Sequence, residues 1–213
     1  MNEEIIKKSN EIYSNKANKY PFTSRAVSWD DMQSQYFRFH EILKHISFEE
    51  NVKILDIGCG NAELFKFLNF SGFKGTYTGI DVNDDLLSQA KELYKGIDVQ
   101  NINILKDHFS LEFDYVVISG LFNMNYGQDL DWTKQMIAKS FKLATKKFIF
   151  NAISSHVNFK QEEMFYINPS EILTFILDNL SSNVILEHGK IPYNFLICAE
   201  KVKNWESISR NNK

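Results

Sequence analysis

A strand that turns directly into a helix through two glycines is the feature of this sequence that most constrains its fold. The apolar run 54–57 is followed by Gly58-Cys59-Gly60, and a helical pattern of apolar residues begins at Leu64. Glycine adopts the backbone conformations that so tight a turn needs, and its missing side chain lets a ligand lie against bare backbone. The stretch therefore predicts an α/β fold with a binding site at the end of its first strand.

The charge beside this turn indicates the kind of ligand. A dinucleotide-binding turn has three glycines in the pattern G-x-G-x-x-G, because a pyrophosphate must approach the helix N-terminus. Here Glu63 stands at the third glycine position, and Asp56 lies two residues before Gly58. A carboxylate there repels a phosphate but can hold a cation. The turn therefore argues against a nicotinamide-dependent oxidoreductase and favours a cationic ligand.

Strand and helix patterns alternate along the chain, which favours a mostly parallel sheet covered on both faces. The predicted strands are 52–57, 76–82, 102–106, 115–119, 147–153, 184–188 and 195–201, and the predicted helices are 2–18, 34–46, 62–70, 84–94, 132–144 and 169–180. The last two strands are joined by a link too short for a parallel crossover, so we expect an antiparallel hairpin. We expect an N-terminal helical cap at 1–48, a ligand-binding domain at 49–203 and a polar tail at 204–213.

The ends of three further strands carry groups that suit a nucleoside. Ligands of open α/β sheets bind at the carboxyl ends of the strands. Asp81, at the end of the second strand, can accept hydrogen bonds from both ribose hydroxyls, and Asp107, at the end of the third, can accept from an adenine amine. Ser119 and Gly120 end the fourth strand and bring the backbone close to the ligand. The alternatives are a plain Gly-x-Gly turn, a helix cap at Asp81 and a loop acid at Asp107. The order of the acids along successive strands favours the binding site.

On these motifs the chain resembles the class I S-adenosylmethionine-dependent methyltransferases. The matching stretches are ILDIGCGNAEL (54–64), YTGIDVN (77–83), LKDHF (105–109) and FDYVVISGLF (113–122). The resemblance implies a doubly wound sheet of seven strands in the order 3-2-1-4-5-7-6, with strand 7 antiparallel. It also implies S-adenosylmethionine as cofactor, a ligand with an ammonium, a sulfonium and no phosphate. The implied cofactor-binding residues are Asp56, Gly58, Cys59, Gly60, Asp81, Val82, Asp107, His108, Ser119 and Gly120.

The N-terminal segment carries a second resemblance. The block RAVSW (25–29), followed by Gln35 and Arg38, is similar to the cap segments of bacterial small-molecule members of that family. This resemblance implies that Gln35 and Arg38 lie over the cofactor. Arg38 can then pair with the cofactor's carboxylate.

Two loops, 122–131 and 154–168, should form the side of the site that receives the methyl acceptor. Phe122, Asn123, Tyr126 and Tyr166 are the candidate substrate residues, with packing as the alternative role for the tyrosines. His156 is the candidate general base, because an imidazole titrates near neutral pH, with a solvated loop histidine as the alternative. A base is optional, since the sulfonium already makes the methyl group electrophilic. We expect no metal, because no set of metal-binding carboxylates follows the fourth strand.

Charge and composition limit the expected partners. The net charge is -3 and no strongly basic block occurs, which argues against a nucleic-acid substrate. No window approaches 18 consecutive apolar residues, which argues against a membrane span, and the two cysteines favour a reducing cytoplasm. The sequence thus predicts a cytoplasmic enzyme that methylates a small molecule. An RNA or protein methyltransferase with the same cofactor site, and a non-catalytic nucleotide-binding module, are the alternatives. The acceptor atom and the oligomeric state stay open.

Overall fold

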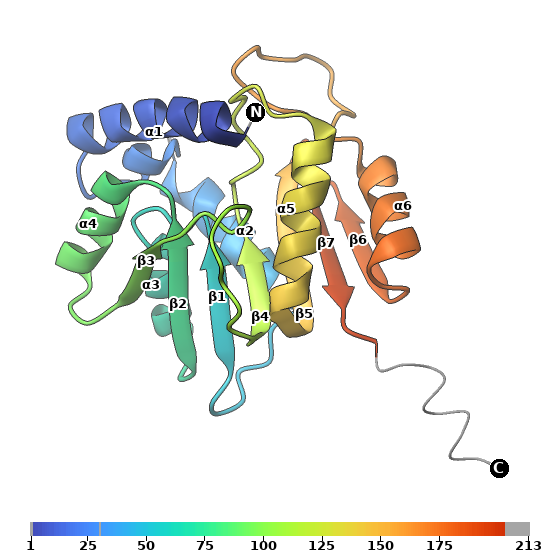
Figure 1. Ribbon diagram of the computed structural model, residues 1–213, viewed down its shortest axis with the longest axis horizontal. Helices are drawn as coiled ribbons and strands as arrows, with labels where there is room; N and C mark the ends of the chain where they lie inside the picture. The colour runs from blue at the N-terminus through green and yellow to red at the C-terminus, as the bar shows by residue number, and fades with distance from the viewer. Residues whose placement is uncertain (1, 30, 203–213) are drawn as a thin grey trace.

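The computed structural model, which describes residues 2–29 and 31–202, contains one seven-stranded sheet in the order β3-β2-β1-β4-β5-β7-β6 (Figure 1). The strands are β1 (Lys53–Ile57), β2 (Thr76–Asp81), β3 (Asp98–Asn101), β4 (Phe113–Ile118), β5 (Ala144–Ile153), β6 (Val184–His188) and β7 (Asn194–Glu200). The first five strands are parallel, and β7 is antiparallel to both β5 and β6. The predicted strand order and the C-terminal hairpin are confirmed.

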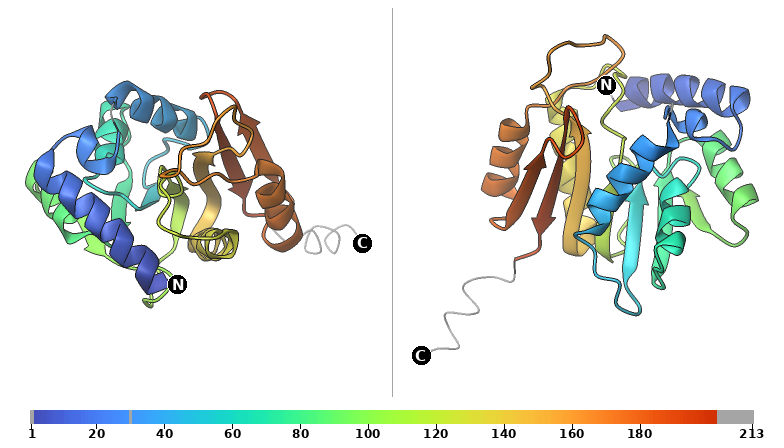
Figure 2. Two further views of the ribbon diagram at one scale, coloured as in Figure 1. Left: turned by 90° about the horizontal axis from the view of Figure 1, so that it is seen from above. Right: turned by 180° about the vertical axis from the view of Figure 1, so that it is seen from behind.

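Helices cover both faces of this sheet. One face packs against α2 (Met32–Leu43), α3 (Glu63–Phe70) and α4 (Asp84–Leu93), and the other against α5 (Leu130–Leu143) and α6 (Pro169–Asn179) (Figure 2). The side chains of β1 show why two layers form: Ile54 joins the core under α2 and α3, whereas Leu55 and Ile57 join the core under α5. All three are buried, as expected for a central strand that is apolar on both faces.

The first helix, α1 (Asn2–Lys19), lies across the carboxyl ends of the strands instead of on a face of the sheet (Figure 1). Polar side chains hold it there. The Asn83 side-chain amide donates to the Ser14 hydroxyl at 3.1 Å, and the Gln89 amide donates to the Ala17 carbonyl at 2.9 Å. A short 3-10 helix, η1 (Ser24–Val27), follows it. The N-terminal segment therefore forms a roof over the edge of the sheet where ligands are expected to bind.

The sequence prediction misplaces the third strand. The predicted strand was 102–106, whereas β3 spans Asp98–Asn101 and pairs with the C-terminal part of β2, from Thr78 to Asp81. β3 is a short edge strand in which only Val99 is buried, so it lacks the apolar alternation that identifies a strand in a sequence. Ile104 belongs to the core cluster that includes Ile5 of α1. The other predicted elements overlap the observed ones and differ only at their ends.

Among residues 2–29 and 31–202, no helix combines the length and the apolar character needed to cross a membrane. The cytoplasmic location and the division between cap and domain at residue 48 stay predictions. The predicted polar tail, 204–213, lies outside the described residues.

Candidate functional site

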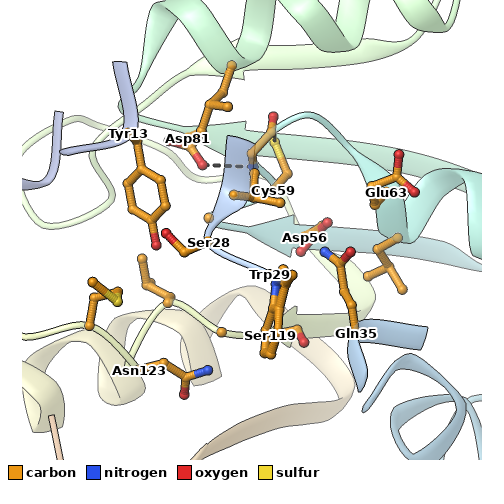
Figure 3. Close-up of a pocket in the computed structure, with 18 of the residues that line it drawn as sticks. Tyr13, Ser28, Trp29, Gln35, Asp56, Cys59, Glu63, Asp81, Ser119 and Asn123 are labelled. Atoms are coloured by element: carbon orange, nitrogen blue, oxygen red, sulfur yellow. Dashed lines mark hydrogen bonds between the residues drawn. The ribbon is translucent and has the colours of Figure 1, made fainter. Parts of the chain in front are cut away.

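A cavity of about 180 Å³ opens at the carboxyl edge of the sheet, beneath α1 (Figure 3). Its lining comes from the turn after β1, the ends of β2 and β4, the first two helices and the loops between them. The structure brings together, in this one cavity, most of the residues that the sequence singled out. These are Gln35, Arg38, Asp56, Gly58, Cys59, Gly60, Asp81, Val82, Ser119, Gly120 and Asn123.

The turn between β1 and α3 has the backbone conformation that its glycines predict. Gly58 and Gly60 have φ angles of 75° and 54°, in the left-handed region that favours glycine. The backbone N–H groups of Gly58 and Cys59 both donate to the Ile80 carbonyl, at 2.8 and 3.1 Å, which ties the turn to β2. A Cβ added to Gly60 would lie 2.7 Å from the Val27 Cγ1 atom. The missing side chain therefore lets η1 approach the turn closely.

We expect Gly60→Ala to lower the free energy of unfolding by about 1–3 kcal/mol, because the positive φ strains an alanine and its Cβ overlaps Val27. Urea or thermal unfolding measures the loss. Val27→Ala removes the overlap but not the backbone strain, so Gly60→Ala should cost less in the Val27→Ala background. An equal loss in both backgrounds would show that the close approach of Val27 contributes nothing.

The carboxylate of Asp81 joins the first two strand ends. It accepts a hydrogen bond from the backbone N–H of Gly60 at 2.8 Å (Figure 3). It also accepts from the backbone N–H groups of Val82 at 2.7 Å and Asn83 at 3.0 Å. Burial raises the pKa of this carboxyl above its ordinary value, although the three backbone donors oppose the shift. Asp81 also lines the cavity, so it can accept further hydrogen bonds from a ligand.

Asp56 is a buried acid at the centre of the cavity floor. Its carboxylate accepts a hydrogen bond from the Tyr77 hydroxyl at 2.8 Å, and the residue is only 3% exposed. Burial raises the pKa of Asp56 to about 7, and the hydrogen bond from Tyr77 opposes that rise. A carboxyl in this state can ionise at neutral pH when a cation approaches it.

Arg38 is a buried cation without an acidic partner among the described residues. Its guanidinium stacks on the Trp29 ring at 4.3 Å and donates to the Ser34 carbonyl at 2.8 Å and to the Asn194 side chain at 3.3 Å. Its Nε atom is buried and has no hydrogen-bond partner. The side-chain oxygen of Gln35 is also buried without a partner. Burial lowers the pKa of Arg38 to about 10, which still leaves it charged at neutral pH. This end of the cavity can bind a carboxylate.

A second, mostly apolar cavity adjoins the first at Asp81 and Val82. It lies between Ile5 of α1 and the turn that carries Asn103. Asp107 does not line either cavity: it is exposed, and its carboxylate accepts a hydrogen bond from the backbone N–H of Asn103 at 2.8 Å. The expected place of Asp107 at the end of a strand is therefore wrong, because β3 ends six residues earlier. Its contact with adenine stays a prediction. His108 is likewise exposed and outside both linings.

The two loops that were predicted to receive the methyl acceptor pair with each other. Met124 and Met164 form an antiparallel bridge, and the Phe165 N–H donates to the Asn123 carbonyl at 2.9 Å. Asn123, Met124 and Met164 all line the first cavity. The pairing of the loops thus places two thioethers and one amide at the end of the cavity that faces away from β2.

The other candidate substrate residues lie elsewhere. Phe122 is fully buried in the core against Trp132, and Tyr126 lines the second cavity, where its hydroxyl lies 2.8 Å from that of Tyr13. Neither Tyr166 nor His156 lines a cavity. The Tyr166 hydroxyl accepts from a backbone N–H of its own loop. His156 is exposed, and its ring lies 6.1 Å from the ring of His188.

Comparison with known families decides the class of protein. A family model described as "Methyltransferase domain" matches residues 48–171, which is more than half of the chain. The chain belongs to this methyltransferase family. The family and the fold class expected from the sequence are thereby confirmed, and the cofactor of these enzymes is S-adenosylmethionine.

Two relatives of this methyltransferase carry the same kind of name. A candidate methyltransferase of Mycobacterium tuberculosis, Rv1506c, is 27% identical over 165 residues, which covers 75% of this chain and 99% of the relative. A second candidate methyltransferase, 235L of Invertebrate iridescent virus 6, is 24% identical over 153 residues and is covered over 57% of its length.

Solved structures show the same fold at low sequence identity. The N-methyltransferase NodS of Bradyrhizobium japonicum, in complex with S-adenosylhomocysteine, has a TM-score of 0.68 at 16% identity, over 92% of this chain and all of NodS. The magnesium protoporphyrin IX methyltransferase of Synechocystis, also with S-adenosylhomocysteine, has a TM-score of 0.62 at 12% identity, over 80% of this chain and 84% of that enzyme.

Sequence analysis of this methyltransferase missed several cavity residues, among them Tyr13, Met124 and Met164. The position of Tyr13 could have been predicted from the sequence. Ile5, Ser9 and Tyr13 are spaced four residues apart, which puts them on one face of α1, and each lines one of the two cavities or both. The sequence does not indicate that the two methionines line the cavity, because their pairing joins loops that are distant in the sequence.

Proposed function

We propose that this methyltransferase transfers the methyl group of S-adenosylmethionine to a small molecule. The enclosed acceptor end of the first cavity carries this proposal. Its walls include Trp29, Asn123, Met124 and Met164, and all four are buried or half-buried. An acceptor must enter a chamber of this kind, whereas a nucleic-acid strand needs an open, basic surface.

The described residues fit the cofactor. Asp81 would accept from the ribose hydroxyls, and Arg38 would pair with the carboxylate of the methionyl group. Asp56 lines the same cavity as Arg38 and would attract the ammonium of the methionyl group. The second cavity would hold adenine, with Asn103 beside the ring in the place that the sequence analysis gave to Asp107. NodS and the porphyrin methyltransferase share this fold and were crystallised with S-adenosylhomocysteine, which supports the choice of cofactor.

When bound, S-adenosylmethionine supplies a methyl group made electrophilic by its sulfonium. The residues of the chain position the reactants and exclude water. The buried ion pair at Arg38 would fix one end of the cofactor, and the Trp29 ring stacked on that guanidinium would separate it from solvent. Positioning of this kind can lower a reaction barrier by about 7–11 kcal/mol in favourable cases.

Cofactor affinity should rise with pH through about 7. Below its raised pKa Asp56 is neutral, and above it Asp56 is a carboxylate that attracts the ammonium. We expect S-adenosylhomocysteine to bind about tenfold more weakly at pH 6 than at pH 8, as measured by calorimetry. Asp56→Asn should bind weakly at both pH values and flatten the dependence. A wild-type affinity that is constant over this range would contradict the assignment.

A methyl-transfer screen over small metabolites, which reads released S-adenosylhomocysteine, tests the proposed function. Turnover of a small molecule supports it. Methylation of RNA or protein fractions in place of small molecules would contradict it, and cofactor binding without any transfer would favour the non-catalytic module.

The same screen tests His156. Because His156 is exposed and outside the cavity lining, we expect His156→Ala to keep cofactor affinity and turnover within about twofold of the wild type. Lost turnover with intact cofactor affinity would instead establish His156 as the general base.

A further inference from the structure

We propose that the methyl acceptor is a small apolar molecule whose nucleophilic atom is an anion, held by the side-chain amide of Asn123. This inference rests on the proposed function and names the substrate class for the same cavity. Thiolates, phenolates and carboxylates all carry an anionic nucleophilic atom of this kind.

The amide of Asn123 presents its nitrogen to the cavity. The residue is 8% exposed, and its side-chain oxygen is buried without a hydrogen-bond partner. The Nδ2 atom lies 3.8 Å from the position that a Cβ on Gly120 would take, and the Trp29 ring lies 3.1 Å from the same point. Figure 3 shows the oxygen turned away from Ser28 and Tyr13, which lie across the cavity. An N–H donor at this place suits an atom with free lone pairs.

The walls around this donor are apolar. Met124 and Met164 face each other across the bridge between the two loops, and Leu121 and Ile153 line the same cavity. The bridge is held by the Asn125 N–H, which donates to the Glu163 carbonyl at 2.8 Å. The body of the acceptor should therefore be apolar, with its polar atom directed at the amide.

Among the described residues, the cavity lacks the side chain that most often takes a proton from a reactant, a histidine. Among the described residues that line it, there is no histidine and no lysine. Its acids, Asp56, Glu63 and Asp81, come from β1, α3 and β2, and each already accepts hydrogen bonds within the protein. The Tyr13 hydroxyl lies 2.8 Å from the hydroxyl of Tyr126. An acceptor that arrives as an anion needs no base.

The loss of charge during methyl transfer to an anion suits the apolar walls of this cavity. The lone pair of the anion forms a bond to the methyl carbon, while the carbon–sulfur bond breaks and its electron pair stays on sulfur. The negative charge of the acceptor and the positive charge of the sulfonium disappear together, and no proton is left over. Apolar surroundings favour a step in which opposite charges disappear. An amine would instead become a cation beside Asn123 and the two methionines, and its proton would still have to leave.

Calorimetry on the protein saturated with S-adenosylhomocysteine tests this inference. Benzoate and benzylamine are probes of similar size and opposite charge, and we expect benzoate to bind at least about tenfold more tightly. Asn123→Asp keeps the shape of the side chain and adds a negative charge. It should weaken benzoate binding at least about tenfold and leave S-adenosylhomocysteine affinity unchanged. Asn158→Asp, on the exposed part of the neighbouring loop, is the matched control and should change neither affinity.

Turnover supplies a second measurement. With S-adenosylmethionine present, thiophenol should be methylated faster than benzylamine, and Asn123→Asp should reduce or reverse that preference. Tighter binding of benzylamine, faster methylation of benzylamine, or an Asn123→Asp variant with unchanged benzoate affinity would each overturn the inference and leave the proposed function intact. A protein that does not bind S-adenosylhomocysteine at all would overturn both.

Discussion

Asp81→Ala should weaken the binding of S-adenosylhomocysteine by about 100-fold, since it removes a half-buried carboxylate that would accept hydrogen bonds from both ribose hydroxyls. It also leaves the backbone N–H groups of Gly60, Val82 and Asn83 without their acceptor. Two costs therefore add: the lost contacts to the ligand, and a turn that is no longer held in the shape that receives it.

Calorimetry with S-adenosylhomocysteine measures the effect, and two variants make it specific. Asp81→Asn keeps an oxygen for the backbone donors but not the charge, so we expect an intermediate affinity. Asp107→Ala removes an exposed acid that lines neither cavity, and it should bind as the wild type does. An Asp107→Ala variant as weak as Asp81→Ala would restore Asp107 to the cofactor site.

Arg38→Met should weaken S-adenosylhomocysteine binding by about 10- to 100-fold while leaving the free protein as stable as before, within about 1 kcal/mol. The guanidinium is buried without an acidic partner in the described part of the chain, so its desolvation is not offset until a carboxylate arrives. Methionine has a similar shape and needs no partner, and it can still pack on Trp29.

A truncated ligand shows which contact is lost. Methylthioadenosine shares the nucleoside but has no amino-acid part, so Arg38→Met should not change its affinity. Arg25→Met, at an exposed arginine outside both cavities, is the matched control for the loss of a positive charge. If both ligands bound equally weakly to Arg38→Met, the arginine would serve the structure of the site and not the methionyl carboxylate.

Local sequence patterns were sufficient to predict the part of this site that β1, β2 and the turn after β1 form. Gly58 and Gly60 need the positive φ that the sequence indicates, and Asp81 ends a strand, β2, that was predicted at the observed place. These residues are close in space because neighbouring parallel strands end at one edge of a sheet. Their assembly therefore follows once each strand is recognised, and the hairpin followed from the length of its link.

The same reasoning failed at the edge of the sheet. β3 is polar apart from Val99, and an edge strand needs no apolar alternation because one side of it meets solvent. The apolar residues just after it, Ile102 and Ile104, looked like the strand but lie in the turn beneath α1 and line the second cavity. As a result, the sequence analysis assigned the adenine contact to Asp107.

By itself, the sequence determined the turn after β1 and the carboxylates that mark a cofactor site, since period and spacing encode them locally. The order of the strands followed from the resemblance to a known family. Only the tertiary structure decided which loop residues line the rest of the cavity. Whether Asn123 or His156 meets the cavity depends on how two loops pair with each other and on which residues α1 covers. Contacts of that kind form between backbone groups, which are the same in every residue, so no side-chain pattern announces them.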